Sequence, residues 1–262
     1  MGVRINFRKF KIDYLILVVS AVVVVSTVYA ARPKEEVVYP RETVTVPEGY
    51  NVEQIDKLLF ESGVLNERGS LSSLSVSEFE EYWFLEEAET LEGFLFPDTY
   101  EFFLESTPDV VARKFLDNWQ KKASYLFMSK NGVLERVILA SMVEREVPNN
   151  GNDRSLVAGL LLKRRSSGMP LQVDSTLCYI KDKLKCGEVV PSDKNPDSSY
   201  NTYKNKGFPP GAISNPGLSA IKAAIAPRAS EYWYFISDPK TGKTVFAKTL
   251  DEHNQNIVKY LR

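Results

Sequence analysis

The most apolar part of the chain is an uncharged run of 18 residues from Tyr14 to Ala31. As a helix this run would be about 27 Å long, close to the thickness of the hydrocarbon core of a bilayer. It predicts a transmembrane helix over residues 13–31. Basic residues precede the run, so the positive-inside rule predicts a single-pass protein of the cell (inner) membrane, with residues 1–12 cytoplasmic and the remainder periplasmic or extracellular. A cleaved signal peptide is the alternative, because Val28-Tyr29-Ala30 resembles a small-x-small cleavage site.

The pattern of polar and apolar positions changes after this run. Residues 32–42 are charged, contain two prolines and show no apolar period, as expected of a linker. Residues 43–46 alternate as a short strand, and after a Pro-Glu-Gly turn apolar residues follow at helical spacing until Gly63. A Ser- and Glu-rich connector with a short acidic helix completes the segment. The pattern predicts a small subdomain and its connector over residues 43–91.

A larger unit, residues 92–262, combines helices with antiparallel strands. Thr107-Pro108 is a good N-cap and first-turn pair for its first helix, and the sequence from Asp238 to Gly242 is typical of a hairpin turn. No regular βαβ alternation is present, so the pattern predicts an α+β fold. The predicted helices are 107–127, 134–147, 154–165, 215–227 and 250–261, and the predicted strands are 171–179, 232–237 and 243–247.

Composition narrows the range of functions. The 262 residues are 44% hydrophobic and 26% charged, with a net charge of -1. With this balance of charges the protein has no strong overall positive field that would attract a polyanion. Nucleic acid is therefore not an expected partner. Two cysteines and a single histidine are too few for the usual zinc sites. A metal hydrolase is therefore not expected, and we expect no cofactor either.

Two carboxyl groups near the end of the helix 134–147 are candidates for chemistry. Glu144 and Glu146 lie two residues apart, which is about 200° around a helix, so only one of them can face a given cleft. Glu146 shares its face with apolar residues, and such neighbours raise the pKa of a carboxyl group so that it holds its proton near neutral pH. The alternative is an acid on the solvated end of the helix, paired with Arg145 or Lys163.

Two segments offer polar groups for binding. Leu171–Thr176 alternates like a strand, with Gln172, Asp174 and Thr176 on one face, and three polar side chains in a row can line a groove. Residues 200–211 form a loop of aromatic, amide and proline residues, which suits carbohydrate because sugar rings stack on aromatic side chains. A solvated strand face and a rigid packing loop are the respective alternatives.

The cysteines and the histidine carry weaker signals. Cys178 and Cys186 are eight residues apart, which fits a disulfide that closes a hairpin, although two free thiols remain open. His253, the single histidine, lies early in the last predicted helix, where a cap or a surface hydrogen bond is favoured over catalysis.

The sequence resembles the YceG-like family, the endolytic murein transglycosylases known as MltG. The resemblance covers most of residues 92–262, in the family's order. The matching stretches are EGFLFPDTYEF (92–102), ILASMVEREV (138–147), RSLVAGLLLKRRSSGMPLQVDSTLCYI (154–180), YNTYKNKGFPPGAISNPGLSAIKAA (200–224) and YFISDP with VFAKTLDEHN (within 234–254).

The resemblance implies a membrane-anchored lytic transglycosylase that cleaves MurNAc-GlcNAc β-1,4 bonds within peptidoglycan glycan strands, leaves 1,6-anhydroMurNAc ends and helps to terminate strand elongation. It identifies Glu146 as the catalytic residue, acting first as an acid and then as a base. It also implies that residues 43–91 are a partial LysM-like subdomain and that peptidoglycan synthases (penicillin-binding proteins) are partners. The substrate-binding residues that it implies are Gln172, Asp174, Thr176, Tyr200, Asn201 and Asn215.

The sequence departs from the family's pattern at three positions. Val147 stands where the family usually has Thr, Ser175 where it has Pro, and Lys163 where it commonly has Asn. Without the Thr hydroxyl, the orientation of Glu146 is open. Two other classes of protein are alternatives: a non-catalytic peptidoglycan-binding scaffold of the cell-wall machinery, and a pyridoxal-phosphate lyase, which the absence of a lysine in a recognisable Schiff-base setting disfavours.

Overall fold

The computed structural model describes Val18, Val22 and residues 39–147, 151–181 and 191–261. No helix within these residues is long and apolar enough to cross a membrane. This finding contradicts the transmembrane helix predicted for residues 13–31, and with it the predicted single-pass membrane location. Apart from Val18 and Val22, that range lies outside the described residues, as do the predicted cytoplasmic residues 1–12.

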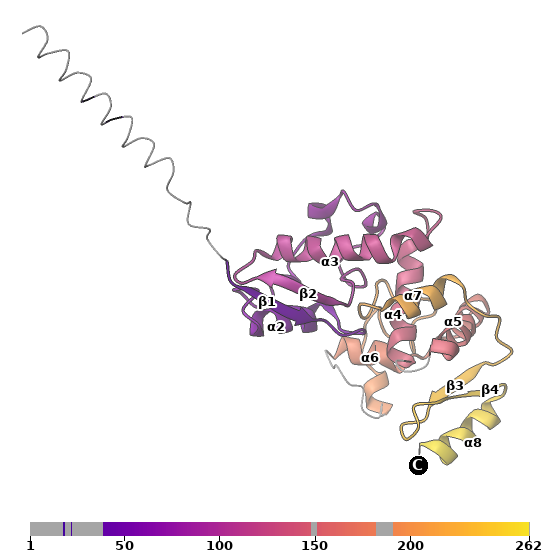
Figure 1. Cartoon of the computed structure of the whole chain (residues 1–262). Helices are drawn as coiled ribbons and strands as arrows, with labels where there is room; N and C mark the ends of the chain where they lie inside the picture. Colours follow the sequence, from indigo (N-terminus) through magenta and orange to yellow (C-terminus); the bar gives the residue numbers. More distant parts are fainter. Residues whose placement is uncertain (1–17, 19–21, 23–38, 148–150, 182–190, 262) are drawn as a thin grey trace, which may run out of the picture. The chain divides into compact units, whose positions relative to one another are not determined.

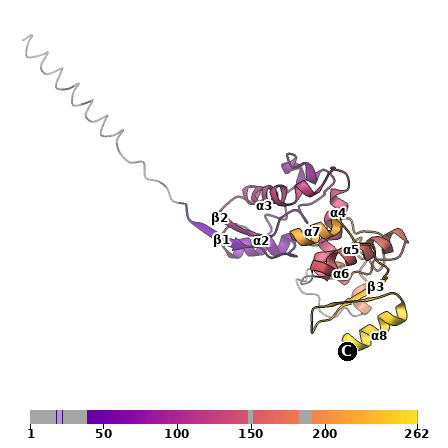
Figure 2. The same ribbon diagram turned by 45° about the vertical axis from the view of Figure 1, so that its right-hand side comes forward.

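The chain from Pro40 to Arg262 forms one unit of mixed α and β structure, which confirms the α+β part of the predicted fold class (Figures 1 and 2). The helices are α2 (Val52–Glu61), α3 (Pro108–Lys122), α4 (Val133–Glu146), α5 (Gly151–Ser166), α6 (Asp174–Ile180), α7 (Leu218–Ile225) and α8 (Leu250–Tyr260). The strands are β1 (Arg41–Thr45), β2 (Thr99–Phe103), β3 (Tyr234–Ser237) and β4 (Thr244–Ala247). Short 3₁₀ helices occupy Val76–Phe79, Trp83–Leu85, Ser124–Leu126 and Pro191–Lys194.

The first sheet joins strands from either side of residue 92. β1 and β2 are antiparallel, with Val44 opposite Tyr100, and both of these side chains are buried. α2 follows β1 and begins with a capping box, in which Asn51 and Gln54 each accept the other's backbone N–H. This sheet connects the predicted subdomain 43–91 to the segment after it, while the domain boundary itself stays a prediction.

An aromatic cluster packs α3 against the segment before β2. Phe84, Phe94 and Trp119 are almost completely buried, and the ring centroids of Phe84 and Trp119 are 4.1 Å apart. Aromatic side chains bury large apolar areas, so a cluster of this kind contributes strongly to the stability of a core. The three successive aromatic residues 82–84 thus belong to the core or pack against it.

Gly93 brings its segment close to α4. Its φ angle of +94° is readily adopted by glycine alone, and a Cβ atom here would lie 2.5 Å from Val137 and 2.8 Å from Ala212. α4 is buried along most of its length and packs against α5 and α7. The core of the unit therefore surrounds α4 and leaves its last turn near the surface.

Two predictions of local structure are wrong. The segment 171–179 is not a strand, because α6 occupies most of it. Gln172 has a φ angle of +53°, which lies outside the β region, and the Thr176 hydroxyl donates to the carbonyl of the helix-capping residue at 2.7 Å. α7 is capped by Gly217 and begins at Leu218, whereas the predicted helix begins at residue 215.

The C-terminal part agrees with the sequence. β3 and β4 form the predicted antiparallel hairpin, and α8 follows with a capping box between Thr249 and Glu252. At the end of β3, the Ser237 hydroxyl donates to the backbone carbonyl of Glu146 at 3.0 Å. The hairpin is thereby attached to the last turn of α4.

Candidate active site

The last turn of α4 carries two carboxyl groups in different surroundings. Glu144 is buried, and its Oε1 atom lies 2.6 Å from a guanidinium nitrogen of Arg154 on α5. Its Oε2 atom accepts the backbone N–H of Gly217 at 3.1 Å. Burial raises the pKa of Glu144, and the Arg154 charge opposes this shift. Both oxygens are thus bonded inside the protein, and the side chain ties α4 to α5 and to the start of α7.

Arg154 is the partner that the sequence did not indicate. It is 3% exposed, and its Nε atom also donates to the carbonyl of Val147 at 2.9 Å. The sequence suggested Arg145 or Lys163 as a partner for an acid at this helix end. No local signal in the sequence points to Arg154, because the pair joins two different helices.

Glu146 is partly exposed at the end of the same helix. Its Oε1 atom accepts the backbone N–H of Ser175, in the first turn of α6, at 3.2 Å. Burial raises the pKa of Glu146 to about 7, and the negative charge of Asp174 adds to the shift, whereas Ser175 and the Arg145 charge oppose it. The pKa of Glu146 is therefore shifted upwards, in the direction that the sequence predicted. A carboxyl group with this pKa can both give and take a proton near neutral pH.

Asp174 is the second acid at this place. It is partly exposed at the start of α6, and it accepts a hydrogen bond from the Tyr203 hydroxyl. Burial raises the pKa of Tyr203, and the charges of Asp174 and Glu146 add to the shift. The loop that contains Tyr203 is therefore attached to α6 beside the two acids.

Arg145 connects this region to the turn before α2. One of its guanidinium nitrogens donates to the carbonyl of Gly49 at 3.0 Å. Partial burial lowers the pKa of Arg145, and the charges of Glu146 and Glu92 oppose that shift. Because its positive charge stabilises the ionised form of Glu146, Arg145 limits how far the pKa of this acid rises.

The six predicted substrate-binding residues fall into two groups. Three have surface that a ligand can reach: Gln172 is exposed, and Asp174 and Tyr200 are partly exposed. Three are completely buried: Thr176, Asn201 and Asn215. The structure brings the first part of α6 to Glu146 through the Ser175 hydrogen bond. Contact of the buried three with a ligand stays a prediction.

Thr176 and Asn201 hold the loop after residue 200 against α6. The Thr176 hydroxyl lies 3.1 Å from the Thr202 hydroxyl, which accepts the backbone N–H of Val173 at 3.0 Å. The Asn201 amide donates to two carbonyl groups of the segment just before it. These side chains fix the loop that carries Tyr203.

Asn215 links segments that are far apart in the sequence. Its Oδ1 atom accepts the backbone N–H groups of Gly93 and Leu95, each at 2.9 Å. Its Nδ2 atom donates to the carbonyl of Tyr50 at 3.0 Å and to Glu92 Oε1 at 2.9 Å. Both polar atoms of the side chain are therefore bonded within the protein.

Glu92 is a buried acid that the sequence did not single out. Its Oε2 atom accepts the backbone N–H of Val52 at 3.1 Å and lies 3.5 Å from the Tyr179 hydroxyl. Burial raises the pKa of Glu92 to about 8. The rings of Tyr179 and Tyr200 pack with centroids 5.0 Å apart. Glu92 thus connects the start of α2 with this tyrosine pair, and its place at the head of EGFLFPDTYEF was the available signal.

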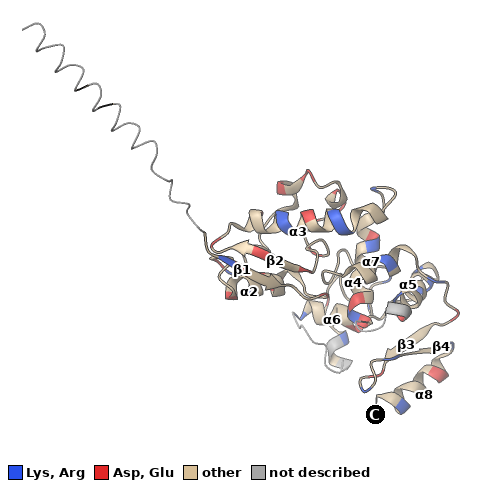
Figure 3. Ribbon diagram, viewed as in Figure 1, with Lys and Arg blue, Asp and Glu red and all other residues tan. Residues whose placement is uncertain are grey.

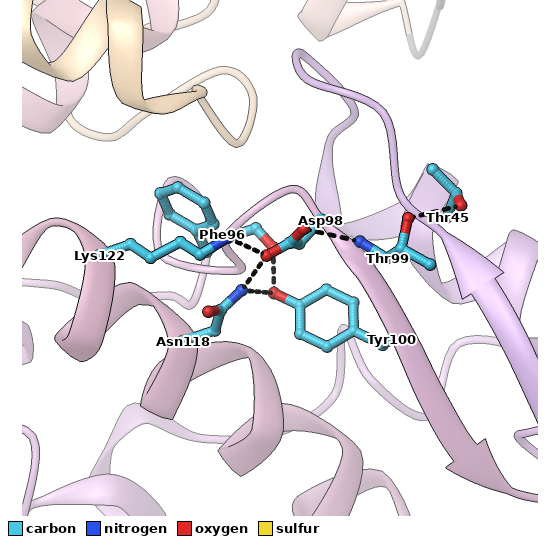
Figure 4. A network of polar contacts seen from close by, with 7 residues as sticks. All are labelled: Thr45, Phe96, Asp98, Thr99, Tyr100, Asn118 and Lys122. Atoms are coloured by element: carbon cyan, nitrogen blue, oxygen red, sulfur yellow. Dashed lines mark hydrogen bonds and ion pairs between the residues drawn. The ribbon is translucent and has the colours of Figure 1, made fainter.

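Asp98 belongs to a separate polar network, seen in Figure 4. Its Oδ2 atom accepts from the Asn118 amide at 2.8 Å and pairs with the Lys122 ammonium, while Oδ1 accepts the backbone N–H of Thr99 at 3.0 Å. Burial raises the pKa of Asp98, but the bonds from Lys122, Asn118 and Thr99 outweigh this and lower it. Asp98 is therefore a paired, ionised acid between α3 and β2.

The described residues show no group of three or more His, Cys, Asp or Glu side chains that could hold a metal ion. Acidic and basic residues are interspersed over the ribbon (Figure 3).

Cys178 is disulfide-bonded, and Cys186, the other cysteine of the sequence, lies outside the described residues. His253 stacks on Tyr234, with ring centroids 5.0 Å apart.

A family model described as the YceG-like family matches residues 24–259. The chain therefore belongs to the YceG-like family. It is 30% identical over 257 residues to the endolytic murein transglycosylase of Streptococcus pneumoniae (strain R6), a match that covers 88% of this chain and 46% of that protein. It is 39% identical over 179 residues to the protein of the same name from Bacillus subtilis (strain 168), covering 65% of this chain and 48% of that protein.

The fold is also similar to a solved structure of this family. The crystal structure of a putative YceG-like protein from Listeria monocytogenes matches with a TM-score of 0.67 and 30% identity, over 83% of this chain and 76% of that one. The chain spans about half the length of the two curated relatives.

Proposed function

We propose that this protein is an endolytic lytic transglycosylase that cleaves peptidoglycan glycan strands, with Glu146 as its catalytic residue. The names of the relatives from Streptococcus pneumoniae and Bacillus subtilis support the substrate and the reaction class. The observation that carries the proposal is the difference between two acids on one helix turn. Glu144 is buried and bonded to Arg154, whereas Glu146 is partly exposed. Burial raises the pKa of both acids to about 7, so it is access to a ligand that separates them.

In the proposed reaction, protonated Glu146 gives its proton to the glycosidic oxygen between MurNAc and GlcNAc while the bond from C1 to that oxygen breaks. The resulting carboxylate then takes the proton of the C6 hydroxyl of the same MurNAc, and the C6 oxygen attacks C1. A group within the same sugar has a high effective concentration. The products are a free GlcNAc hydroxyl and a 1,6-anhydroMurNAc end; no water is consumed, and Glu146 is protonated again.

We assign direct glycan contact to Gln172, Asp174 and Tyr200, the predicted binding residues with accessible surface. Tyr200 offers a ring face on which a sugar can stack. The three buried residues of the predicted set would act by holding the loops in place. Termination of nascent strands, a peptidoglycan synthase as partner and a LysM-like role of residues 43–91 belong to the same proposal and follow from the family resemblance.

Hydrolysis is the second candidate, because a second acid, Asp174, lies close enough for its charge to raise the pKa of Glu146. Two carboxyl groups that flank a glycosidic bond can activate water or form a covalent intermediate. The hydrogen bond from Tyr203 to Asp174 favours the lytic reaction, since it occupies one of the Asp174 oxygens. A non-catalytic glycan-binding scaffold would require an inert Glu146.

The test is digestion of purified sacculi by the full chain, followed by mass analysis of the released ends. Glu146→Gln is the test variant, and Glu144→Gln, two residues away, is its matched control. We expect the unaltered protein to release anhydro-ended fragments, which are lighter by one water than hydrolysed ones, and Glu146→Gln to release none. Reducing MurNAc ends would support the hydrolase, and the absence of fragments from the unaltered protein would support the scaffold.

A further inference from the structure

Tyr179 is an aromatic residue near Glu146 that has no part in the proposed reaction. It lies on α6, four residues beyond Ser175, whose backbone N–H donates to Glu146 Oε1 at 3.2 Å. Four residues make about one turn of a helix and about 6 Å along its axis, so Tyr179 lies on the same side of α6 as Ser175. α6 also packs against α4, the helix that ends with Glu146 (Figure 1). Tyr179 is therefore placed one turn of α6 away from the contact with this acid.

Tyr179 and Tyr200 form a pair of rings that come from two different segments. The ring centroids are 5.0 Å apart, with an angle of 41° between the two planes. Close packing fixes Tyr200, since a Cβ atom on Gly211 would lie 2.7 Å from the Tyr200 hydroxyl oxygen. Both tyrosines are nevertheless partly exposed. The pair is therefore an aromatic surface that a ligand can reach.

The hydroxyl end of Tyr179 faces the protein interior. The hydroxyl lies 3.5 Å from Oε2 of the buried Glu92. Glu92 is in turn held by the backbone N–H of Val52 at 3.1 Å and by the Asn215 amide at 2.9 Å. Burial raises the pKa of Tyr179, and the charge of Glu92 adds to the shift. Because the hydroxyl is directed to Glu92, Tyr179 offers a ligand the surface of its ring.

Two exposed carboxyl groups lie within electrostatic reach of the pair. The charge of Glu53 acts on Tyr179, and the charge of Glu89 acts on Tyr200. A carboxylate accepts hydrogen bonds and donates none, so it suits the hydroxyl groups of a sugar. The apolar face of a sugar ring packs on an aromatic ring. The surroundings of the pair therefore fit a carbohydrate.

We propose that Tyr179 is a glycan-contacting residue, which together with Tyr200 binds a sugar ring next to the bond that Glu146 cleaves. This inference rests on the proposed function, which assigns glycan contact to Tyr200 and gives Tyr179 no role. The ring of Tyr179 holds the strand and takes no part in proton transfer. Its loss therefore weakens binding and raises KM, while kcat and the pH dependence of kcat stay nearly unchanged.

Two substitutions in the full chain separate the ring of Tyr179 from its hydroxyl. Tyr179→Leu removes the ring, whereas Tyr179→Phe keeps the ring and removes the hydroxyl. Tyr232 provides the matched control, because it is also partly exposed and its ring packs on that of Phe246, with centroids 5.2 Å apart. Tyr232→Leu then reports the general effect of losing one ring of such a pair.

The measurements are kcat and KM on glycan strands, Tm, and the Kd for peptide-free glycan strands in chains that also carry Glu146→Gln. We expect Tyr179→Leu to raise both KM and Kd about fivefold, as the loss of one aromatic contact implies. Tyr179→Phe and Tyr232→Leu should keep both values close to those of the unaltered ring. A folded Tyr179→Leu variant with unaltered KM and Kd would overturn the proposal. Equal weakening by Tyr179→Phe would also overturn it, because the hydroxyl and not the ring would then be responsible.

A second readout depends neither on activity nor on the folding of Tyr179→Leu. Tyrosine rings labelled with ¹³C in the Glu146→Gln chain give NMR signals, and those of Tyr179 and Tyr232 are assigned by replacing each with Phe. Peptide-free glycan strands should shift the Tyr179 signal and leave the Tyr232 signal in place.

The two readouts distinguish the failure of this inference from the failure of the proposed function. If the unaltered protein cleaves no glycan but the strands shift the Tyr179 signal, the proposed function fails and the Tyr179 contact stands. If the unaltered protein cleaves glycan and the Tyr179 signal does not respond to the strands, the Tyr179 contact is overturned and the proposed function stands.

Discussion

Glu144 and Glu146 lie on one helix turn in different surroundings. Glu144 points towards α5 and α7, where Arg154 and a backbone N–H bind its two oxygens. Glu146 meets the start of α6, is partly exposed and has an acidic neighbour. Burial raises the pKa of both. A raised pKa alone therefore does not distinguish a catalytic acid from a structural one, and access to a ligand does.

The largest effect is expected from removing the transferable proton. Glu146→Gln should lower the rate of glycan cleavage by about a thousandfold, because the amide keeps the shape of the side chain and cannot act as an acid or a base. Circular dichroism and Tm should show an intact fold. Glu144→Gln should retain most of the activity, and the opposite order of the two variants would reverse the assignment.

The structural role of the other acid is tested through its partner. Arg154→Met should lower the free energy of unfolding in urea by about 3 kcal/mol, because it leaves the Glu144 charge buried without a cation. The double variant Arg154→Met/Glu144→Gln should recover part of that loss, since no buried charge remains. If Arg154→Met is as stable as the unaltered protein, the ion pair between Glu144 and Arg154 does not contribute to stability.

The pH profile distinguishes the two acids in the same protein. In the proposed reaction the protonated form of Glu146 acts first, and its pKa is raised to about 7. We therefore expect kcat to be constant below this pH and to fall about tenfold per pH unit above it. Glu144→Gln should leave this limb in place. Rates measured from about pH 5 to about pH 9 check the expectation, and a fall that begins near the ordinary pKa of a glutamate would count against it.

A smaller effect comes from the neighbouring acid. The charge of Asp174 raises the pKa of Glu146, so Asp174→Asn should move the alkaline limb of kcat down by about half a pH unit. Asp251→Asn removes the same charge from an exposed acid in the first turn of α8 and should leave the limb unchanged. Equal shifts in both variants would mean that net charge, not proximity, is responsible.

Local signals made much of the fold predictable. The Thr107-Pro108 pair marks the start of α3, and the turn from Asp238 to Gly242 joins β3 to β4, as their residue types indicate. The strand predicted at residues 171–179 failed because a short alternation fits more than one structure. The left-handed backbone of Gln172 accompanies a bond from its N–H to the Thr202 carbonyl, which only the folded chain supplies.

The candidate site could be predicted from the sequence only in part. The apolar face of α4 was enough to expect a raised pKa for Glu146, because helix geometry fixes which residues share a face. The bonds of Glu144 to Arg154 and of Glu146 to Ser175 were not predictable, since each joins two different helices. Asn215 matched a family position, but its burial depends on segments that its own sequence context does not identify.

The central claim is that Glu146 works without a second carboxyl group that activates water. Digestion of sacculi in water enriched in ¹⁸O tests this most directly, because hydrolysis places a solvent oxygen on C1 and ring closure by the C6 hydroxyl does not. The account predicts 1,6-anhydroMurNAc ends that carry no ¹⁸O from solvent. Reducing MurNAc ends labelled with ¹⁸O at most of the cleaved bonds would contradict it and would make Asp174 the second acid of a hydrolase.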